Sequence, residues 1–150
     1  MNILEPSEQK IFDEAYRQAQ KSLSEGGIPI GAALSLGTTL VASGHNERIQ
    51  RNDPIAHGEM ACLRNAGRRR DYRRMTLFST LAPCDMCTGA VLLFGIPRVV
   101  VGEAETFPGM LDYLKARGVE VVLLNDARCV ALMLDFQQHW PEAWQEDIGA

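Results

Sequence analysis

Four side chains in two short segments of this sequence could together hold and use a metal ion. His57 and Glu59 flank a single glycine, and Cys84 and Cys87 stand three positions apart directly after Pro83. One imidazole and two thiolates make three zinc ligands. Structural zinc sites usually have four protein ligands, whereas catalytic sites often have three and leave one position for water. Glu59 can supply the general base that such a water needs. The pattern therefore predicts a catalytic zinc site with His57, Cys84 and Cys87 as ligands.

Two helix starts must bring these residues together. Pro83 suits the first turn of a helix, where its missing N–H costs nothing, and the two cysteines then share one face of that turn. A helix N-terminus also favours thiolates over thiols. On a regular helix His57 and Glu59 would diverge by about 200°, so their convergence requires a helix that begins next to His57. We therefore expect the metal to lie between the N-termini of two helices.

The charges of the ligands indicate the role of Glu59. Two thiolates cancel the charge of Zn²⁺, so this ion is a weaker Lewis acid than one bound by three neutral histidines, and it still makes water a nucleophile near neutral pH. Glu59 is expected to accept a proton and return it to the ring and then to the leaving amine, a transfer worth about 10²–10⁴-fold in rate. The implied reaction is hydrolysis at an amidine-like carbon with loss of ammonia.

Two other interpretations of the cysteines remain open. A purely structural zinc site would need a fourth ligand, and the spare cysteines, Cys62 and Cys129, fall in expected helices as small core residues. A redox-active Cys-x-x-Cys would require neither the histidine nor the glutamate. His45 and His139 are expected at the surface or beside the site rather than as ligands.

Composition bounds the class of protein. A chain of 150 residues fits one domain, 1–150, and its hydrophobic fraction of 46% and charged fraction of 23% are ordinary for globular proteins. The net charge of −4 gives no overall attraction to nucleic acid or anionic membranes. Residues 1–10 are polar, and no apolar run approaches the roughly 18–20 residues of a membrane span. We expect a cytoplasmic protein with reduced cysteines and no membrane partner.

The order of the expected elements predicts the fold class. Residue periodicity predicts helices at 6–23, 56–66, 84–94, 110–116 and 126–139, and strands at 31–36, 40–44, 75–80, 98–102 and 119–124. A helix and a hairpin followed by alternating helices and strands indicate an α/β protein, a three-layer α/β/α sandwich with a central mixed five-stranded sheet and helices on both faces. The apolar runs 99–101 and 119–124 are expected to be strands covered on both faces. A short tail, 142–147, completes the chain.

The metal motifs and several longer strings resemble the cytidine deaminase superfamily, whose members combine His-[Ala/Gly/Cys]-Glu with Pro-Cys-x-x-Cys. Within it, the sequence is most similar to the fungal-type cytosine deaminases. The matching strings are 25–31, 44–46, 57–59, 83–90, 94–98, 100–103 and 144–149. They cover nearly the whole chain, and the C-terminal string is the specific part, because most superfamily members lack it. The resemblance implies a cytidine deaminase-like fold, one Zn²⁺ per chain, a free nucleobase substrate and a homodimer.

The same resemblance implies contacts to the substrate. Apolar walls would supply affinity for a small planar base, and a few polar groups would orient it. The C-terminal segment 140–150 would act as a lid that excludes water during the reaction and opens for product. The implied polar contacts come from Asn46, the backbone N–H of Gly58 and Asp147, and the implied walls are Ile30, Phe107 and Trp144.

Departures from the fungal pattern leave the ring substituents open. Ala82 replaces a serine, Gln145 replaces an aromatic residue, and the stretch 107–111 differs in sequence and is one residue shorter. Because that stretch is expected at the edge of the pocket, it bears on which substituents fit. We expect hydrolysis of cytosine to uracil and ammonia. Isocytosine, a modified cytosine, guanine and creatinine are the alternatives.

A strip of arginines raises a second alternative. Residues 68–74 hold five of the fifteen basic residues. Such a strip could bind phosphates, as in a tRNA adenosine-editing deaminase. The acidic remainder of the chain and the expected lid favour a solvated turn, so nucleic acid is not the expected partner. The apolar run 90–94 could belong to the core or to a contact between subunits.

Overall fold

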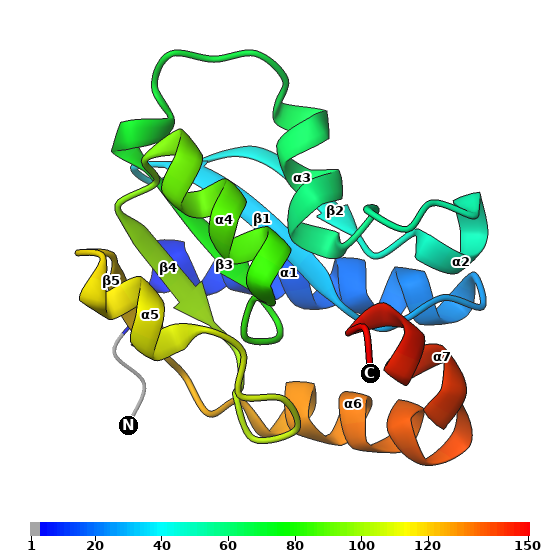
Figure 1. Cartoon of the computed structure of the whole chain (residues 1–150). Coiled ribbons are helices and arrows are strands. Elements are labelled where there is room, and N and C mark those ends of the chain that lie inside the picture. Colours follow the sequence, from blue (N-terminus) through cyan, green and yellow to red (C-terminus); the bar gives the residue numbers. More distant parts are fainter. Residues whose placement is uncertain (1–3) are drawn as a thin grey trace.

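A mixed sheet runs through the middle of the molecule with its strands in the order β2-β1-β3-β4-β5 (Figure 1). The strands of the computed structural model, which describes residues 4–150, are β1 (Gly31–Leu36), β2 (Thr39–His45), β3 (Met75–Ser79), β4 (Arg98–Val101) and β5 (Glu120–Leu123). β1 is antiparallel to both of its neighbours, whereas β3, β4 and β5 run parallel. The predicted mixed five-stranded sheet is therefore confirmed.

Helices cover both faces of this sheet, which confirms the predicted three-layer sandwich. The longer helices are α1 (Pro6–Ser24), α3 (Gly58–Ala66), α4 (Asp85–Phe94), α5 (Leu111–Ala116) and α6 (Ala127–His139). One apolar core cluster joins the sheet to α3, α4 and α5, and a second joins its other face to α1 and α6. Among the described residues, no helix combines the length and apolar character needed to cross a bilayer.

Alternation along the strands builds these two clusters. In β4, Val99 and Val101 face the cluster with α3–α5, whereas Val100 faces the cluster with α1 and α6. Leu77 and Phe78 divide in the same way in β3. All five side chains are fully buried, and each such burial stabilises the fold by about 1.5–3 kcal/mol. Two-sided burial explains why β3 and β4 are nearly continuous apolar runs.

The last strand departs from the prediction. The run 119–124 was expected to be covered on both faces, but β5 is an edge strand, and Leu123 is 37% exposed while Val122 is buried. A strand at the end of the sheet lies at the margin of the helix layers, so they cover it incompletely, and along β5 both Glu120 and Leu123 are exposed. The expectation of two-sided burial is therefore wrong for β5.

Three short elements were missed or left without a type by sequence periodicity. They are α2 (Arg48–Arg51), the 3-10 turn η1 (Tyr72–Arg74) and α7 (Pro141–Asp147), which forms most of the tail. Pro141 occupies the first turn of α7, where proline is favoured. A third apolar cluster packs α7 against the segment before β1 and consists of Ile28, Ile30, Leu81, Met133, Phe136 and Trp144.

Candidate metal centre and surrounding pocket

Two helix starts carry the predicted metal ligands, as expected from the sequence. His57 is the N-cap of α3 and has an extended backbone, with φ −65° and ψ 160°. Cys84 is the N-cap of α4, likewise extended, and Cys87 lies in the first turn of that helix. The extended backbone at His57 turns its side chain toward the other helix start, while Glu59 follows inside α3.

The three ligand atoms have the spacing of a tetrahedral zinc site. His57 Nδ1 lies 3.4 Å from Cys84 Sγ and 3.7 Å from Cys87 Sγ, and all three atoms lie within 4.8 Å of one another. Tetrahedral bonds of the usual Zn–N and Zn–S lengths separate nitrogen from sulfur by about 3.6 Å. The donor set therefore fits one zinc ion with no rearrangement. Two thiolates and an imidazole are also ligands that zinc prefers.

The ligands polarise one another. Hydrogen bonding between the two thiols lowers the pKa of Cys84 to about 4, aided by His57, and together with burial raises the pKa of Cys87 well above its usual value. Burial by itself lowers the pKa of His57, but the Cys84 thiolate and Asp147 raise it to about 9. The surrounding groups of the protein therefore stabilise the Cys84 thiolate. A bound divalent cation would favour the thiolate of Cys87 and the neutral form of the His57 imidazole as well.

Glu59 is a buried carboxylic acid beside the ligands. It is 4% exposed and lies in the first turn of α3. Burial, with help from the Cys84 thiolate and against the opposing effect of His57, raises the pKa of Glu59 to about 7. A carboxyl group poised near neutrality both accepts and releases a proton readily.

Asp147, on α7, joins this cluster from the other end of the chain. Its Oδ1 accepts a hydrogen bond from Asn46 Nδ2 at 3.2 Å and lies 3.3 Å from His57 Nε2. Burial raises the pKa of Asp147, whereas His57 and Asn46 lower it. The Nε2 of His57 faces a carboxylate while Nδ1 faces the thiols, so Asp147 favours the tautomer that leaves Nδ1 free to bind metal.

Asn46 is fully buried and its position is fixed. Its Oδ1 accepts from the backbone N–H of Arg48 at 3.0 Å, and its backbone carbonyl accepts from Ser22 Oγ at 2.6 Å. A side-chain amide has two N–H donors and two acceptor lone pairs. After the bonds to Arg48 and Asp147, one donor and one lone pair remain. A ring carbonyl next to a ring N–H would need this donor and this acceptor.

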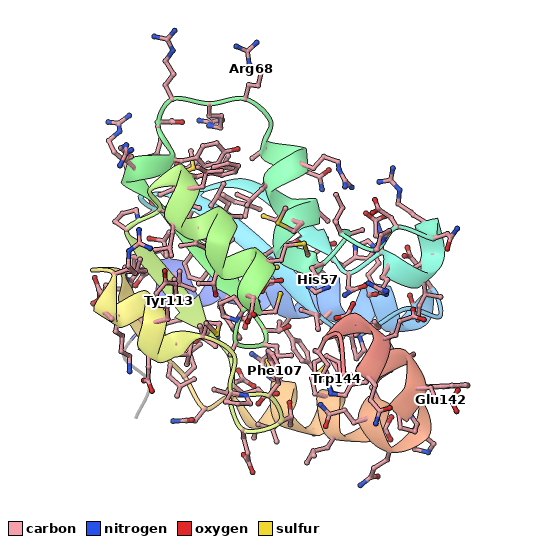
Figure 2. All side chains as sticks on the ribbon, in the orientation of Figure 1. His57, Arg68, Phe107, Tyr113, Glu142 and Trp144 are labelled. Carbon is pink, nitrogen blue, oxygen red and sulfur yellow. The ribbon has the colours of Figure 1, made fainter. Side chains whose placement is uncertain are left out.

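Apolar side chains close the space around this cluster. The cavity beside His57 and Glu59 has a volume of about 10 Å³, which is room for roughly one water molecule. Phe107 and Trp144 meet edge to face, with ring centroids 5.6 Å apart, and Figure 2 shows them side by side below His57. The predicted wall residue Ile30 lines the same cavity, together with Leu81 and Ile148.

Gly58 supports the arrangement by being small. It is the first residue of α3, where a backbone N–H has no acceptor within the helix. A Cβ at this position would lie 3.0 Å from the carbonyl oxygen of Ile30, tighter than normal packing allows. The glycine therefore lets the start of α3 approach the cavity wall. The structure thus brings together every side chain and backbone group that the sequence predicted for the site.

Two residues near the cavity were not predicted. Arg48 binds α7 from outside, with its Nε 3.1 Å from Glu146 Oε1. Glu103 is a carboxyl only 1% exposed and accepts hydrogen bonds from the loop that leads to Phe107. A signal for Glu103 was available, because an acidic residue directly after a buried apolar strand requires buried partners. No sequence signal marks the pairing of Arg48 with Glu146.

The other histidines and cysteines lie outside the ligand set. Cys62 and Cys129 are buried core residues, as predicted. His45 is only 8% exposed, so the surface alternative for it is wrong, and its ring nitrogens lie 2.8 Å from Gln18 Oε1 and 2.9 Å from Glu25 Oε1. It directly precedes Asn46, so these two hydrogen bonds also help to hold Asn46 in place. His139 is exposed.

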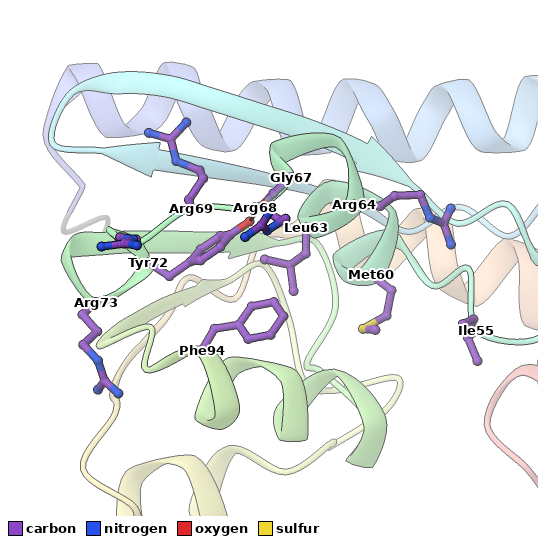
Figure 3. Close-up of a pocket in the computed structure, with 11 residues that line it drawn as sticks. Ile55, Met60, Leu63, Arg64, Gly67, Arg68, Arg69, Tyr72, Arg73 and Phe94 are labelled. Atoms are coloured by element: carbon purple, nitrogen blue, oxygen red, sulfur yellow. Dashed lines mark hydrogen bonds between the residues drawn. The ribbon is translucent and has the colours of Figure 1, made fainter.

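The arginine strip borders a different and larger hollow of about 730 Å³, which contains none of the metal or acid–base residues. Figure 3 shows Phe94 and Leu63 on its floor, with Arg64 and Arg73 on either side. Arg69 pairs with Asp71, whereas within residues 4–150 no ion pair involves Arg68 or Arg70. The hollow is larger than the cavity at His57, but only the smaller cavity holds groups that can do chemistry.

A three-layer α/β/α fold with a His-Cys-Cys centre and a buried glutamate defines a zinc-dependent hydrolytic deaminase. The sequence profile described as "Cytidine and deoxycytidylate deaminase zinc-binding region" matches residues 5–103. The chain belongs to this family, and its cofactor is zinc.

Similar proteins agree with this assignment. A cytosine deaminase from Candida albicans is 50% identical over 145 residues, covering 95% of this chain and 97% of that protein. A tRNA-specific adenosine deaminase from Streptococcus pyogenes serotype M1 is 38% identical over 111 residues, covering 71% of this chain and 65% of that protein. The solved structure of guanine deaminase from Nitrosomonas europaea superposes with a TM-score of 0.76 at 21% identity, covering 92% of this chain and 87% of that one, which shows a shared fold.

Proposed function

We propose that this enzyme hydrolyses free cytosine to uracil and ammonia. The observation that carries the proposal is the closed cavity over the metal centre, which α7 seals with Trp144 and Asp147. When α7 closes over the substrate, a small free base can lie beneath it, whereas a sugar on the base would obstruct the closure. The similarity to the Candida albicans cytosine deaminase over almost the whole chain supports the same substrate.

The residues of the cavity divide into three roles in this proposal. When bound, zinc activates a water molecule for attack on the ring carbon that bears the amino group. Glu59 accepts one proton from the water and gives it to the ring nitrogen, then accepts the proton of the added hydroxyl group and gives it to the departing amine, so that the carbonyl forms as ammonia leaves. Asn46 and the Gly58 N–H hold the ring carbonyl, and Asp147 accepts from the amino group. Ile30, Phe107 and Trp144 cover the faces of the ring.

The C-terminal segment 140–150 acts as a lid in the same proposal. A cavity with room for one water cannot admit a pyrimidine, so a wall must move before substrate enters. α7 is a short helix joined to α6 through Trp140, which is 60% exposed. The Arg48–Glu146 ion pair fastens α7 at the surface, where such pairs contribute only about 0–1 kcal/mol. This weak fastening suits a segment that opens and closes in each turnover.

The test is ammonia release by the zinc-loaded protein. Cytosine, isocytosine, 5-methylcytosine, creatinine, guanine, cytidine and a tRNA anticodon stem are compared in parallel. Turnover of cytosine with cytidine inert is the expected result. Turnover of another free base alone would move the specificity to the wall around Phe107. Turnover of the RNA alone would contradict both the lid and the free-base substrate.

The second candidate is a tRNA adenosine deaminase, favoured by Arg68 and Arg70, which form no ion pair within residues 4–150, and by the similarity to the Streptococcus pyogenes enzyme. It predicts tight, salt-dependent binding of tRNA. Replacement of Arg68 and Arg70 by Glu separates the two candidates, because it would abolish RNA deamination and leave cytosine turnover unchanged.

We also propose a homodimer formed through α3 and α4. α4 exposes Leu93, which is 78% exposed. The hollow beside α3 and α4 is lined in part by the apolar side chains of Ile55, Met60 and Phe94. Exposed apolar side chains gathered on one side of a molecule mark protein interfaces. The four unpaired cysteines fit a reducing cytoplasm, where release of uracil would serve pyrimidine salvage.

A further inference from the structure

The side chain of Glu103 is a buried carboxyl group with no role in the chemistry described above. It lies just beyond β4 and is 1% exposed. Within residues 4–150 no ion pair involves it. Its Oε2 instead accepts from the backbone N–H groups of Glu105 at 2.8 Å and Thr106 at 2.9 Å, and its Oε1 accepts from Thr106 Oγ1 at 2.5 Å. Three donors from two successive residues wrap the chain around this carboxyl group.

The residue that follows this turn is Phe107. Its ring packs edge to face on Trp144 and lines the cavity at the metal centre. One further contact holds the turn from outside, since Gln137 Nε2 on α6 donates to the Thr106 carbonyl at 3.4 Å. Phe107 is partly buried and packs at the edge of the third apolar cluster. The turn that Glu103 holds sets the backbone from which its ring reaches that cluster.

The same loop is tied to the segment that carries the metal ligand Cys84. The Glu103 carbonyl accepts from the N–H of Ala82 at 3.0 Å, and the Pro83 carbonyl accepts from the N–H of Met110 at 3.2 Å. Gly109 lies so close to this segment that a Cβ there would be 2.7 Å from the Pro83 carbonyl oxygen. The loop 103–110 is thus attached at both of its ends to the segment just before Cys84. The side chain of Glu103 holds the turn in the middle of this loop.

We propose that Glu103 is a positioning residue for the substrate: its carboxylate holds the turn that places Phe107 over the ring, and so sets the affinity for the base and the ring substituents accepted. The proposal rests on the cytosine deaminase function, because it assigns Phe107 to the ring face. The structural part of the proposal, that Glu103 keeps Phe107 packed against Trp144, can be tested without any substrate.

A merely stabilising turn is the alternative, and the chain provides a matched control for it. Asp126 is a carboxylate that also accepts from two backbone N–H groups, those of Arg128 at 2.9 Å and Cys129 at 3.3 Å, as the N-cap of α6. Within residues 4–150, no hydrogen bond or ring contact joins Asp126 to Phe107 or Trp144. Replacement of either carboxylate removes comparable hydrogen bonds, but only the replacement of Glu103 is expected to change the cavity.

The experiment compares Glu103→Met, Glu103→Gln, Thr106→Val and Asp126→Ala in a Trp140→Phe background, where Trp144 is the one remaining tryptophan. Acrylamide quenching of Trp144 fluorescence reports how well Phe107 covers it. KM, kcat and the ratio of kcat/KM for 5-methylcytosine and cytosine report the effect on substrate. Thermal unfolding reports stability alone.

Glu103→Met is expected to raise the quenching constant about two-fold and KM about ten-fold or more, with a smaller change in kcat, because it removes bonds to a charged acceptor. The 5-methylcytosine ratio shifts as well. Glu103→Gln restores most of each value, since its amide offers an oxygen to the two N–H groups and a donor to the Thr106 hydroxyl. Thr106→Val gives an intermediate result and serves if Glu103→Met does not fold. Asp126→Ala lowers the unfolding temperature and changes neither quenching nor KM.

Three outcomes distinguish the positioning role of Glu103 from the cytosine deaminase function on which it rests. If folded Glu103→Met and Thr106→Val lose only stability, as Asp126→Ala does, the positioning role is wrong and cytosine deamination is untouched. If quenching rises but the parent protein leaves cytosine unchanged, the cytosine deaminase function is wrong while Glu103 still positions Phe107. If quenching and KM rise equally in Asp126→Ala, the effect is general loosening and the proposal is overturned.

Discussion

The Nε2 atom of His57 and the Oδ1 atom of Asp147 lie 3.3 Å apart, although the two residues are far apart in the sequence. The contact links the metal centre to α7, the helix that closes the cavity. A carboxylate on the outer nitrogen of a ligating histidine orients the ring and makes it a better ligand. Asp147 therefore serves both the zinc ion and, in the proposed reaction, the amino group of the base.

This dual contact predicts that Asp147→Ala weakens zinc binding as well as turnover. Loss of such an outer partner costs about 10–100-fold in metal affinity or activity. Zinc affinity measured by competition with a chromogenic chelator should fall within that range, and kcat/KM for cytosine should fall with it even at saturating zinc. Glu146→Ala is the control, because Glu146 is the adjacent acidic residue and its ion pair within the described residues is with Arg48 at the surface. Unchanged zinc affinity in Asp147→Ala would contradict the link.

Replacement of Glu59 should separate chemistry from metal binding. Glu59→Gln keeps the shape of a fully enclosed side chain but removes its ability to take a proton. Ammonia release from cytosine should fall by about 10²–10⁴-fold, while zinc content measured by mass spectrometry stays at one ion per chain. Glu47→Gln, a nearby change in a glutamate that pairs with Arg51, should leave both values intact. Substantial activity in Glu59→Gln would show that another group transfers the proton.

The cysteines offer a matched pair for the metal. Cys84→Ser should lose zinc and activity together, because serine replaces a thiolate whose pKa lies near 4 with a neutral hydroxyl. Cys62→Ser changes an equally reduced but buried cysteine that contacts the Ala42 carbonyl. It should lower stability and keep zinc. Equal zinc loss in the two variants would mean that the ligand set includes Cys62. A parent protein that remains active after its zinc has been removed by dialysis would exclude zinc dependence.

The sequence predicts the metal centre well because its determinants are local. Pro83 before Cys84 and an apolar stretch after His57 both mark helix starts, and each ligand lies at or next to such a start. The fold class follows from the alternation of helices and strands. Boundaries shift by one or two residues where an N-cap such as Asp126 or Cys84 has extended backbone dihedrals.

Tertiary relationships are the part that sequence patterns leave out. The run 119–124 is as apolar as a central strand, yet its place at the edge of the sheet depends on the strand order. Arg48 and Glu146 are ordinary surface charges in the sequence and meet only because α7 folds back beside α2. Asp147 was expected to contact the substrate, but its contact with His57 requires knowing which ring nitrogen faces the thiols.

Trp144 provides a test of the lid. Its ring is buried in the cluster that attaches α7, whereas Trp140, four residues earlier, is mostly exposed. Trp144→Leu keeps an apolar side chain but removes the edge-to-face contact with Phe107, so KM for cytosine should rise about ten-fold, in line with aromatic contacts of about 0.5–1.5 kcal/mol plus lost burial. Trp140→Leu should leave KM unchanged. Equal KM values in both variants, measured by steady-state kinetics, would remove Trp144 from the substrate site.

The exposed side of α4 provides a test of the subunit contact. Leu93 protrudes from the last turn of α4 with 78% of its surface exposed, and in a homodimer a two-fold axis would bury it in both copies. Leu93→Glu should therefore convert a dimer into a monomer, as measured by sedimentation velocity at micromolar concentration. Leu134→Glu is the matched control, since Leu134 is an exposed leucine on α6 at the other face of the sheet. A parent protein that already sediments as a monomer would refute the proposed dimer, and a dimer that survives Leu93→Glu but not Leu134→Glu would move the interface to α6.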